Sequence, residues 1–182
     1  VPFPGGPPAM AGSPTVGAFF TQRVVVGVGD MAAANNSSVI LSTFALGSCI
    51  GVVMHDSATK ASALLHFMLP DSTISPEKAV KQPAMFADTG FASMVRAFLG
   101  LKGAATRAKC YIAGGAGVIS GTDAFKIGER NIAAARVFVQ KFALNVVAAD
   151  VGGINNRTLH LNIATGELTM KSPVETRTVD LR

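Results

Sequence analysis

Cysteine, histidine and charged residues are scarce in this sequence. Its 182 residues include two cysteines and three histidines, and only 15% of the residues are charged. Two cysteines do not make a disulfide scaffold in a chain of this length, so we expect reduced thiols and a cytoplasmic protein. The cysteines and histidines also lie too far apart in the sequence to show a zinc-ligand spacing. We therefore expect no metal site.

Long apolar runs and clusters of one charge sign are missing as well. No apolar run reaches the roughly 18 residues of a membrane-spanning helix, so we expect no membrane insertion. Lysines and arginines are scattered and give a net charge of +5 without a basic stripe, which argues against nucleic acid as a partner. The glycine-rich stretches 114–117 and 150–153 lack the spacing of a phosphate-binding loop, so tight turns explain them better.

Hydrophobic residues make up 49% of the chain, which is enough for one domain with a proper core. The first 18 residues differ from the rest, because they hold five of the nine prolines together with four glycines. We expect residues 1–18 to be a flexible tail outside the fold, either native or left over from cloning. Residues 19–182 are expected to form a single domain.

The apolar pattern predicts an α+β domain. Apolar residues at helical spacing predict amphipathic helices over residues 87–100 and 131–144, and a shorter helix begins at residues 75–76. The pattern favours mostly antiparallel strands with at least two helices packed outside. Strands are predicted at residues 22–29, 38–46, 50–55, 61–69, 110–113, 145–150 and 158–163, the last followed by a turn at 165–166 and a returning strand.

One short window holds the parts of a Cys-His hydrolase. Cys49 ends the run LGSC at residues 46–49, with Thr43 six residues before it and His66 seventeen residues after it. A thiol is a strong nucleophile as thiolate, and a neighbouring imidazole is the usual base that produces it near neutral pH. A hairpin of the strands at 50–55 and 61–69 would bring Cys49 and His66 together at one end. From spacing alone, a strand threonine and a sheet histidine remain open interpretations of Thr43 and His66.

The other candidate side chains have plainer explanations. Cys110 lies in an apolar stretch and is typical of a buried structural thiol. His55 falls in the polar turn 55–60 and His160 on the polar face of the last hairpin, so we expect both to be solvated. Asp88 and Asp150 are alternatives to Thr43 as partner of the imidazole, because a carboxylate offsets imidazolium charge and a hydroxyl does not.

Several blocks in a fixed order resemble the CheD family of chemoreceptor glutamine deamidases. They lie between about residue 24 and residue 171, at 42–52, 65–70, 86–90, 114–116, 127–131 and 150–153, with Arg157 after the last. The resemblance implies a layered, β-sandwich-like core with helices packed outside. It also implies that Cys49 is the nucleophile, His66 the general base and acid, and Thr43 the third member of the site.

The resemblance further implies hydrolysis of selected glutamine side chains in methyl-accepting chemotaxis proteins, through a Cys49 thioester and without a cofactor. Backbone amides at Gly47, Ser48 and Cys49 are candidates for an oxyanion hole, and the family places Asp150 and Gly152 in the substrate groove. The implied partners are the receptor's cytoplasmic domain and a CheC-type phosphatase. Two alternatives stay open: an adaptor that binds receptor or phosphatase without catalysis, and a deamidase of other proteins.

Overall fold

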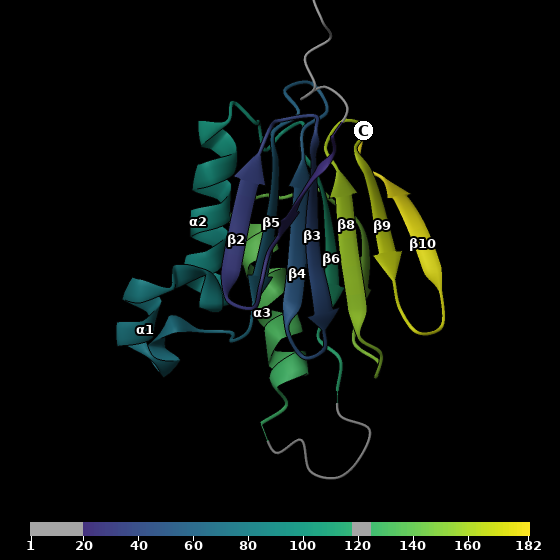
Figure 1. Ribbon diagram of the computed structural model, residues 1–182. Coiled ribbons are helices and arrows are strands. Elements are labelled where there is room, and N and C mark those ends of the chain that lie inside the picture. The colour runs from purple at the N-terminus through teal and green to yellow at the C-terminus, as the bar shows by residue number, and fades with distance from the viewer. Residues whose placement is uncertain (1–19, 118–124) are drawn as a thin grey trace, which may run out of the picture.

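Two five-stranded β-sheets lie face to face, and helices pack against the outer side of one of them (Figure 1). The computed structural model describes residues 20–117 and 125–182, so the tail expected at residues 1–18 lies outside the described residues. The helices are α1 (Pro76–Lys81), α2 (Ala87–Gly100) and α3 (Ile127–Lys141), with short 3-10 helices at Ser72–Ile74 and Pro83–Met85. The strands are β1 (Gln22–Val25), β2 (Asp30–Ala34), β3 (Val39–Leu46), β4 (Ile50–His55), β5 (Ser62–Phe67), β6 (Lys109–Gly114), β7 (Val146–Val151), β8 (Arg157–Asn162), β9 (Glu167–Lys171) and β10 (Thr176–Asp180).

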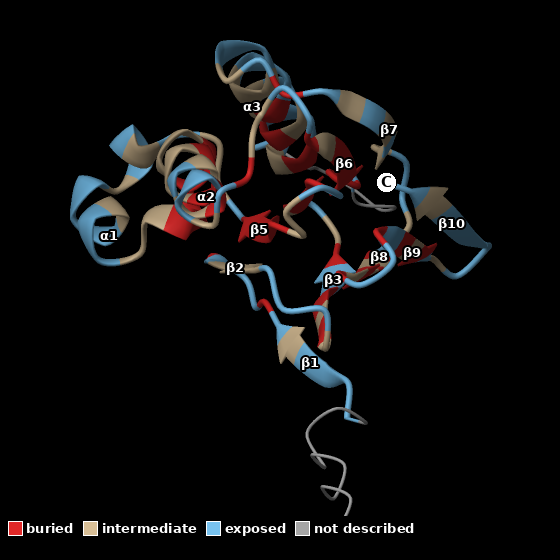
Figure 2. Cartoon of the chain, turned by 90° about the horizontal axis from the view of Figure 1, so that it is seen from above, coloured by how far each residue is buried: buried red, intermediate tan, exposed pale blue. Residues whose placement is uncertain are grey.

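Strand pairing divides the chain into a first sheet, ordered β1-β3-β8-β9-β10, and a second sheet, ordered β2-β5-β4-β6-β7. The pairs β1–β3 and β6–β7 are parallel, and the other pairs of named strands are antiparallel. Figure 2 shows the resulting layers from above, with the helices, the second sheet and the first sheet following one another. The predicted α+β fold, with a mostly antiparallel sandwich-like core and helices outside, is confirmed.

Apolar side chains fill the two spaces between these three layers. The second sheet is the middle layer, so its inner strands β4 and β5 are buried along their whole length. Strand β8 belongs to an outer layer and alternates between buried and half-buried residues, because one of its faces meets solvent. We call the apolar cluster between the two sheets the inter-sheet layer; it includes Leu41, Leu46, Val53, Leu64, Tyr111, Leu159, Leu161, Leu168 and Met170.

Most strand boundaries lie within two residues of the prediction, but three features of the fold differ more. The strand predicted at 22–29 is two strands, β1 and β2, and they belong to different sheets. A turn that includes Gly29, with φ of 71°, separates them and carries the chain from one sheet to the other. The second long helix begins at Ile127, four residues before the predicted start, and ends at Lys141. The edge strand β10 was not predicted at all.

The buried histidine His55 contradicts its predicted solvation. Its side chain is fully buried, its Nδ1 lies 2.9 Å from the hydroxyl of Ser62, and the backbone of Gly166 packs against the ring. His160 is half-buried and its Nδ1 lies 2.8 Å from the hydroxyl of Ser42, so it is only partly exposed to solvent and the prediction holds in part. Cys110 is a free and fully buried thiol, as predicted. Within residues 20–117 and 125–182, no helix is long and apolar enough to cross a membrane.

Candidate active site

Thr43 and His66 contact each other across the inter-sheet layer. Thr43 lies on β3 of the first sheet and His66 on β5 of the second, and both side chains are buried. The Thr43 hydroxyl donates to the carbonyl oxygen of Val26 at 2.7 Å and lies 2.8 Å from Nδ1 of His66. A hydroxyl has one proton to donate, and a carbonyl oxygen can only accept. We therefore assign the proton of the neutral imidazole to Nδ1, which donates to Thr43.

The other ring nitrogen of His66 is left with a free lone pair. Nε2 is buried and has no hydrogen-bond partner among the described residues. Burial lowers the pKa of His66 to about 4, so the imidazole is neutral near pH 7. A neutral imidazole held through Nδ1–H, with Nε2 unoccupied, is the form that can accept a proton as a general base.

Cys49 lies in the loop that joins β3 to β4, at the same end of the sandwich as His66. In the β4–β5 ladder His66 stands opposite Gly51, two residues after Cys49. Alternation along the strand therefore directs Cys49 to the face that carries His66, and Cys49 packs against the inter-sheet layer. The thiol is free and half-buried. Burial raises its pKa, while the backbone N–H of Cys49 acts in the opposite direction.

A bulge in β3 re-aims the chain between Thr43 and Cys49. The register of β3 against β8 shifts between Thr43 and Leu46, and Ala45 takes the left-handed conformation with φ of 56°. The N–H of Gly47 then donates to the carbonyl oxygen of Ala45 at 2.9 Å. Bulges beside active sites commonly redirect side chains in this way. The Gly47 N–H is thus engaged, whereas the N–H groups of Ser48 and Cys49 have no backbone acceptor among the described residues.

Residues 114–116 hold the Cys49 loop from the other side. The N–H of Gly115 donates to the Cys49 carbonyl oxygen and that of Ala116 to the Gly47 carbonyl oxygen, each at 2.8 Å. Gly114 has φ of 115°, and a Cβ at this position would lie 2.1 Å from the Cys49 carbonyl oxygen. Of the glycines predicted to need a positive φ, Gly114, Gly115, Gly152 and Gly153 have one and Gly117 does not.

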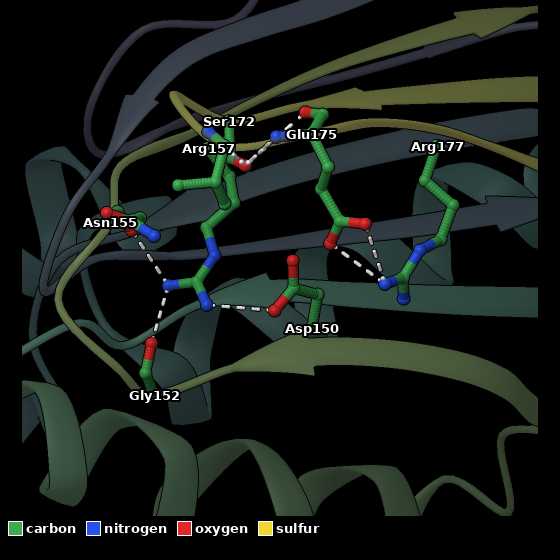
Figure 3. A network of polar contacts seen from close by, with 8 residues as sticks. Asp150, Gly152, Asn155, Arg157, Ser172, Glu175 and Arg177 are labelled. Atoms are coloured by element: carbon green, nitrogen blue, oxygen red, sulfur yellow. Dashed lines mark hydrogen bonds and ion pairs between the residues drawn. The ribbon is translucent and has the colours of Figure 1, made fainter.

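Asp150, Gly152 and Arg157 form a network at the end of β7 that supports this segment (Figure 3). Arg157 is buried, and it donates to the Asp150 carboxylate at 2.8 Å and to the Gly152 carbonyl oxygen at 2.6 Å. The N–H of Gly152 donates to the carbonyl oxygen of Gly114 at 2.9 Å. The two predicted groove residues are thus linked to the Cys49 loop through Gly114.

The carboxylates considered as alternatives to Thr43 are engaged elsewhere. Asp88 accepts from the backbone N–H and the hydroxyl of Ser72, and Asp150 accepts from Arg157. In the part of the chain that the structure describes, Nδ1–H of His66 donates its hydrogen bond to the hydroxyl of Thr43 and not to a carboxylate. The same part contains no group of three His, Cys, Asp or Glu side chains that could hold a metal ion.

Sequence reasoning gave no role to Asn131, which the structure brings to this site. Its side-chain amide donates to the carbonyl oxygens of Ser48 and Met68. The residue stood in one of the blocks that carry the family resemblance. Its position in an amphipathic helix, however, gave no sign that it reaches two loops more than 60 residues away in sequence.

Comparisons with known proteins show which family and relatives this chain resembles. A family model described as "CheD chemotactic sensory transduction" matches residues 68–172, more than half of the 182 residues. A protein of Syntrophus aciditrophicus, named "Probable chemoreceptor glutamine deamidase CheD 1", is 40% identical over 82% of this chain and 93% of its own. Proteins of Solibacter usitatus and Pyrococcus abyssi with the same name, lacking the numeral, are 37% and 34% identical over 82% and 85% of this chain. These matches cover 89% and 94% of the two relatives.

Proposed function

The chain belongs to the CheD family, and on that premise we propose that it is a cysteine-dependent glutamine deamidase of chemoreceptors. The observation that carries the proposal is the bond between Thr43 and His66, which leaves Nε2 of a neutral imidazole free beside the loop of Cys49. The relatives' shared name supplies the substrate class, a glutamine side chain of a chemoreceptor.

The proposed reaction begins from a neutral thiol and a neutral imidazole. Nε2 of His66 takes the thiol proton while Sγ of Cys49 forms a bond to the carboxamide carbon of the glutamine. The N–H groups of Ser48 and Cys49 stabilise the oxyanion of this tetrahedral intermediate, a contribution of about 3–4 kcal/mol for each well-placed donor. The C–N bond then breaks, His66 gives its proton to the departing ammonia, and a thioester remains on Cys49.

Water completes the reaction by the reverse route. His66 removes a proton from water as the water oxygen bonds to the thioester carbon. The C–S bond breaks, the proton on His66 returns to the sulfur of Cys49, and glutamate is released. Thr43 contributes by orienting the ring of His66 and keeping the Nδ1–H tautomer throughout.

We assign the predicted groove residues a shaping part in this site. The side chain of Asp150 and both polar groups of the Gly152 backbone are used in hydrogen bonds within the protein. Their contribution is then to fix the wall formed by residues 114–116 against the Cys49 loop. Gly47 has a similar part, because its carbonyl oxygen accepts from Ala116.

The same proposal assigns the protein its binding partners and its place in the cell. The substrate glutamines lie in the cytoplasmic domain of the receptor, so the protein acts in the cytoplasm, which suits two free thiols. The family resemblance also implies a CheC-type phosphatase as a binding partner. Copurification of a tagged CheC-type protein from the same genome with this chain tests that interaction directly.

Mass spectrometry of a receptor fragment tests the activity. A purified cytoplasmic receptor fragment is incubated with the wild type, with Cys49→Ala and with Cys110→Ala, and its peptides are weighed. Conversion of glutamine to glutamate adds about one mass unit, and it should occur with the wild type and Cys110→Ala but not with Cys49→Ala. No conversion by the wild type, together with an alkylatable Cys49, would point to another substrate; an unreactive Cys49 would favour the adaptor.

A further inference from the structure

Asn131 uses both protons of its side-chain amide on the two chain segments that carry the proposed chemistry. It lies in α3 and is fully buried. Nδ2 donates to the carbonyl oxygen of Ser48 at 2.9 Å and to that of Met68 at 2.8 Å. Ser48 directly precedes Cys49, and Met68 follows His66 by two residues. One planar group therefore touches both segments.

These two hydrogen bonds lie just beyond the end of the backbone ladder between β4 and β5. The last pair of the β4–β5 ladder is Ile50 with Phe67, so the next opposed positions are Cys49 and Met68. Their backbone groups are directed elsewhere, because the N–H of Met68 donates to Met85 and the carbonyl oxygen of Cys49 accepts from Gly115. Beyond the ladder, the Asn131 amide is the link between the two segments among the hydrogen bonds of the described residues.

We propose that Asn131 is a positioning residue that holds the Cys49 loop against the end of β5 and so fixes the distance between Sγ of Cys49 and Nε2 of His66. This inference rests on the proposed function, since it concerns the same pair. If the Cys49 loop and the end of β5 shift relative to each other, the distance between Sγ of Cys49 and Nε2 of His66 changes. Misplacement of about 1 Å between reacting groups can lower the rate on the order of 100-fold.

The choice of residue supports positioning over simple packing. A neutral amide offers two donors in one plane, whereas a buried cation would need a counter-charge and a hydroxyl offers one donor. The acceptor Oδ1 of Asn131 is buried without a partner among residues 20–117 and 125–182. Leaving an acceptor unpaired disfavours folding, so the two donated bonds, rather than maximal stability, account for an amide at this position.

Steady-state kinetics of the receptor fragment test the inference with a matched control. Asn131→Ala removes both bonds, and Ser62→Ala removes the buried bond to His55 at the opposite end of β5. At a temperature where circular dichroism shows both variants folded, Asn131→Ala should lower kcat at least 10-fold with KM within about twofold. Ser62→Ala should leave kcat within about twofold. Equal kcat values for the two variants would overturn the proposal.

The variant Asn131→Asp supplies a pH readout that a packing role would not produce. Its carboxyl has the shape of the amide but faces two carbonyl oxygens in a buried place, so its pKa should be raised. The ionised form donates no hydrogen bond and the protonated form donates one. Relative to wild type, kcat of Asn131→Asp should therefore rise as the pH falls from 8 to 5. A constant ratio over this range contradicts the inference.

Alkylation separates this inference from the proposed function, because it needs no receptor. We expect iodoacetamide to label the half-buried Cys49 but not the fully buried Cys110, and intact mass follows the labelling. The substitution His66→Gln should slow the labelling of Cys49 several-fold when Asn131 is present. When Asn131 is replaced by alanine, the same substitution should slow it less than twofold. An equal effect of His66→Gln in both backgrounds, or no effect in either, rejects the positioning role. Failure of the deamidase assay alone rejects only the receptor substrate.

Discussion

The Thr43 hydroxyl lies 2.8 Å from Nδ1 of His66 and fills the place that a carboxylate takes in Ser-His-Asp sites. A hydroxyl orients the ring and fixes its tautomer, but it gives no charge to stabilise an imidazolium. This agrees with the lowered pKa of His66, about 4, which is caused by burial. An imidazolium formed here is a stronger acid than one in water, which favours proton transfer to the departing ammonia.

Thr43→Val tests this relationship with a side chain of nearly the same shape. The variant leaves Nδ1–H of His66 and the carbonyl oxygen of Val26 without their partner in a buried place. We expect kcat/KM to fall about 10- to 100-fold, part of the roughly 10²–10⁴ that a positioned acid-base group contributes. We also expect the free energy of unfolding to be about 1–3 kcal/mol lower than in the wild type. Steady-state kinetics and urea unfolding measure the two effects.

A neighbouring hydroxyl provides the control for that variant. Ser42 also bonds a histidine at 2.8 Å, but its partner is His160. Ser42→Ala should leave kcat/KM within about twofold of wild type, and Thr43→Ser, which retains the hydroxyl, should retain most of the activity. Equal losses of kcat/KM in Ser42→Ala and Thr43→Val would contradict a catalytic role of the Thr43 hydroxyl.

The pH dependence of kcat/KM should show an acid limb near pH 4. His66 must be neutral to accept the thiol proton, and its lowered pKa keeps it neutral well below pH 6.5. The raised pKa of Cys49 keeps the thiol protonated through neutral pH, so the rate should be flat from about pH 5 to 8. An acid limb near pH 6.5 would instead show that burial does not lower the pKa of His66. Circular dichroism at each pH excludes unfolding as the cause.

Much of this fold could be predicted from local pattern. The strand β4 has the predicted bounds, and α2 begins at Ala87 and ends at Gly100 as its apolar spacing indicated. The edge strand β10 could not be found in this way. Most of its residues are exposed and it lacks apolar alternation, so only its pairing with β9 makes it a strand.

The residues of the proposed site could be named from the sequence, but their contacts could not. Cys49 and His66 could be related through one hairpin, and the ladder of β4 and β5 bears that out. The bond from Thr43 to His66 joins different sheets, and the bonds of Asn131 join a helix to two loops. Such pairings depend on how layers stack, which sequence spacing does not encode. The burial of His55 was not predicted for the same reason, because Gly166, which packs against its ring, lies more than 100 residues later in the sequence.

Gly114→Ala should disrupt the Cys49 loop. The added Cβ would lie 2.1 Å from the Cys49 carbonyl oxygen, at a φ of 115° that L-residues rarely adopt. We expect a loss of at least about 1–3 kcal/mol in unfolding free energy and a large fall in kcat. Gly100→Ala is the matched control, because a Cβ at the end of α2 meets nothing within 4 Å. That variant should be unchanged or up to about 1 kcal/mol more stable in urea unfolding. Equal stabilities for the two variants would contradict the crowding at Gly114.

Asp56 gives the fold a pH-dependent stabilisation at the end of the sandwich opposite Cys49. Its side chain is 1% exposed and lies 2.6 Å from the guanidinium of Arg107. Burial by itself raises the pKa of this carboxyl. The bonds from Arg107 and from the N–H groups of Ala104 and Ala58, together with the Arg107 charge, outweigh burial and lower the pKa to about 2. The folded state therefore favours the ionised carboxyl more than the unfolded chain does, whose pKa is about 3.9.

The sign of the effect follows from these two values. Stability from a carboxyl with a lowered pKa is fully present above the unfolded value and is lost as pH falls toward the folded value. The difference in unfolding free energy between wild type and Asp56→Asn should thus be constant above about pH 5 and shrink between about pH 4 and 2. Urea unfolding across this range measures it, with Asp180→Asn as a solvent-exposed control whose smaller difference should vanish in high salt. A difference for Asp56→Asn that does not change with pH would show that the charge of this carboxylate contributes nothing.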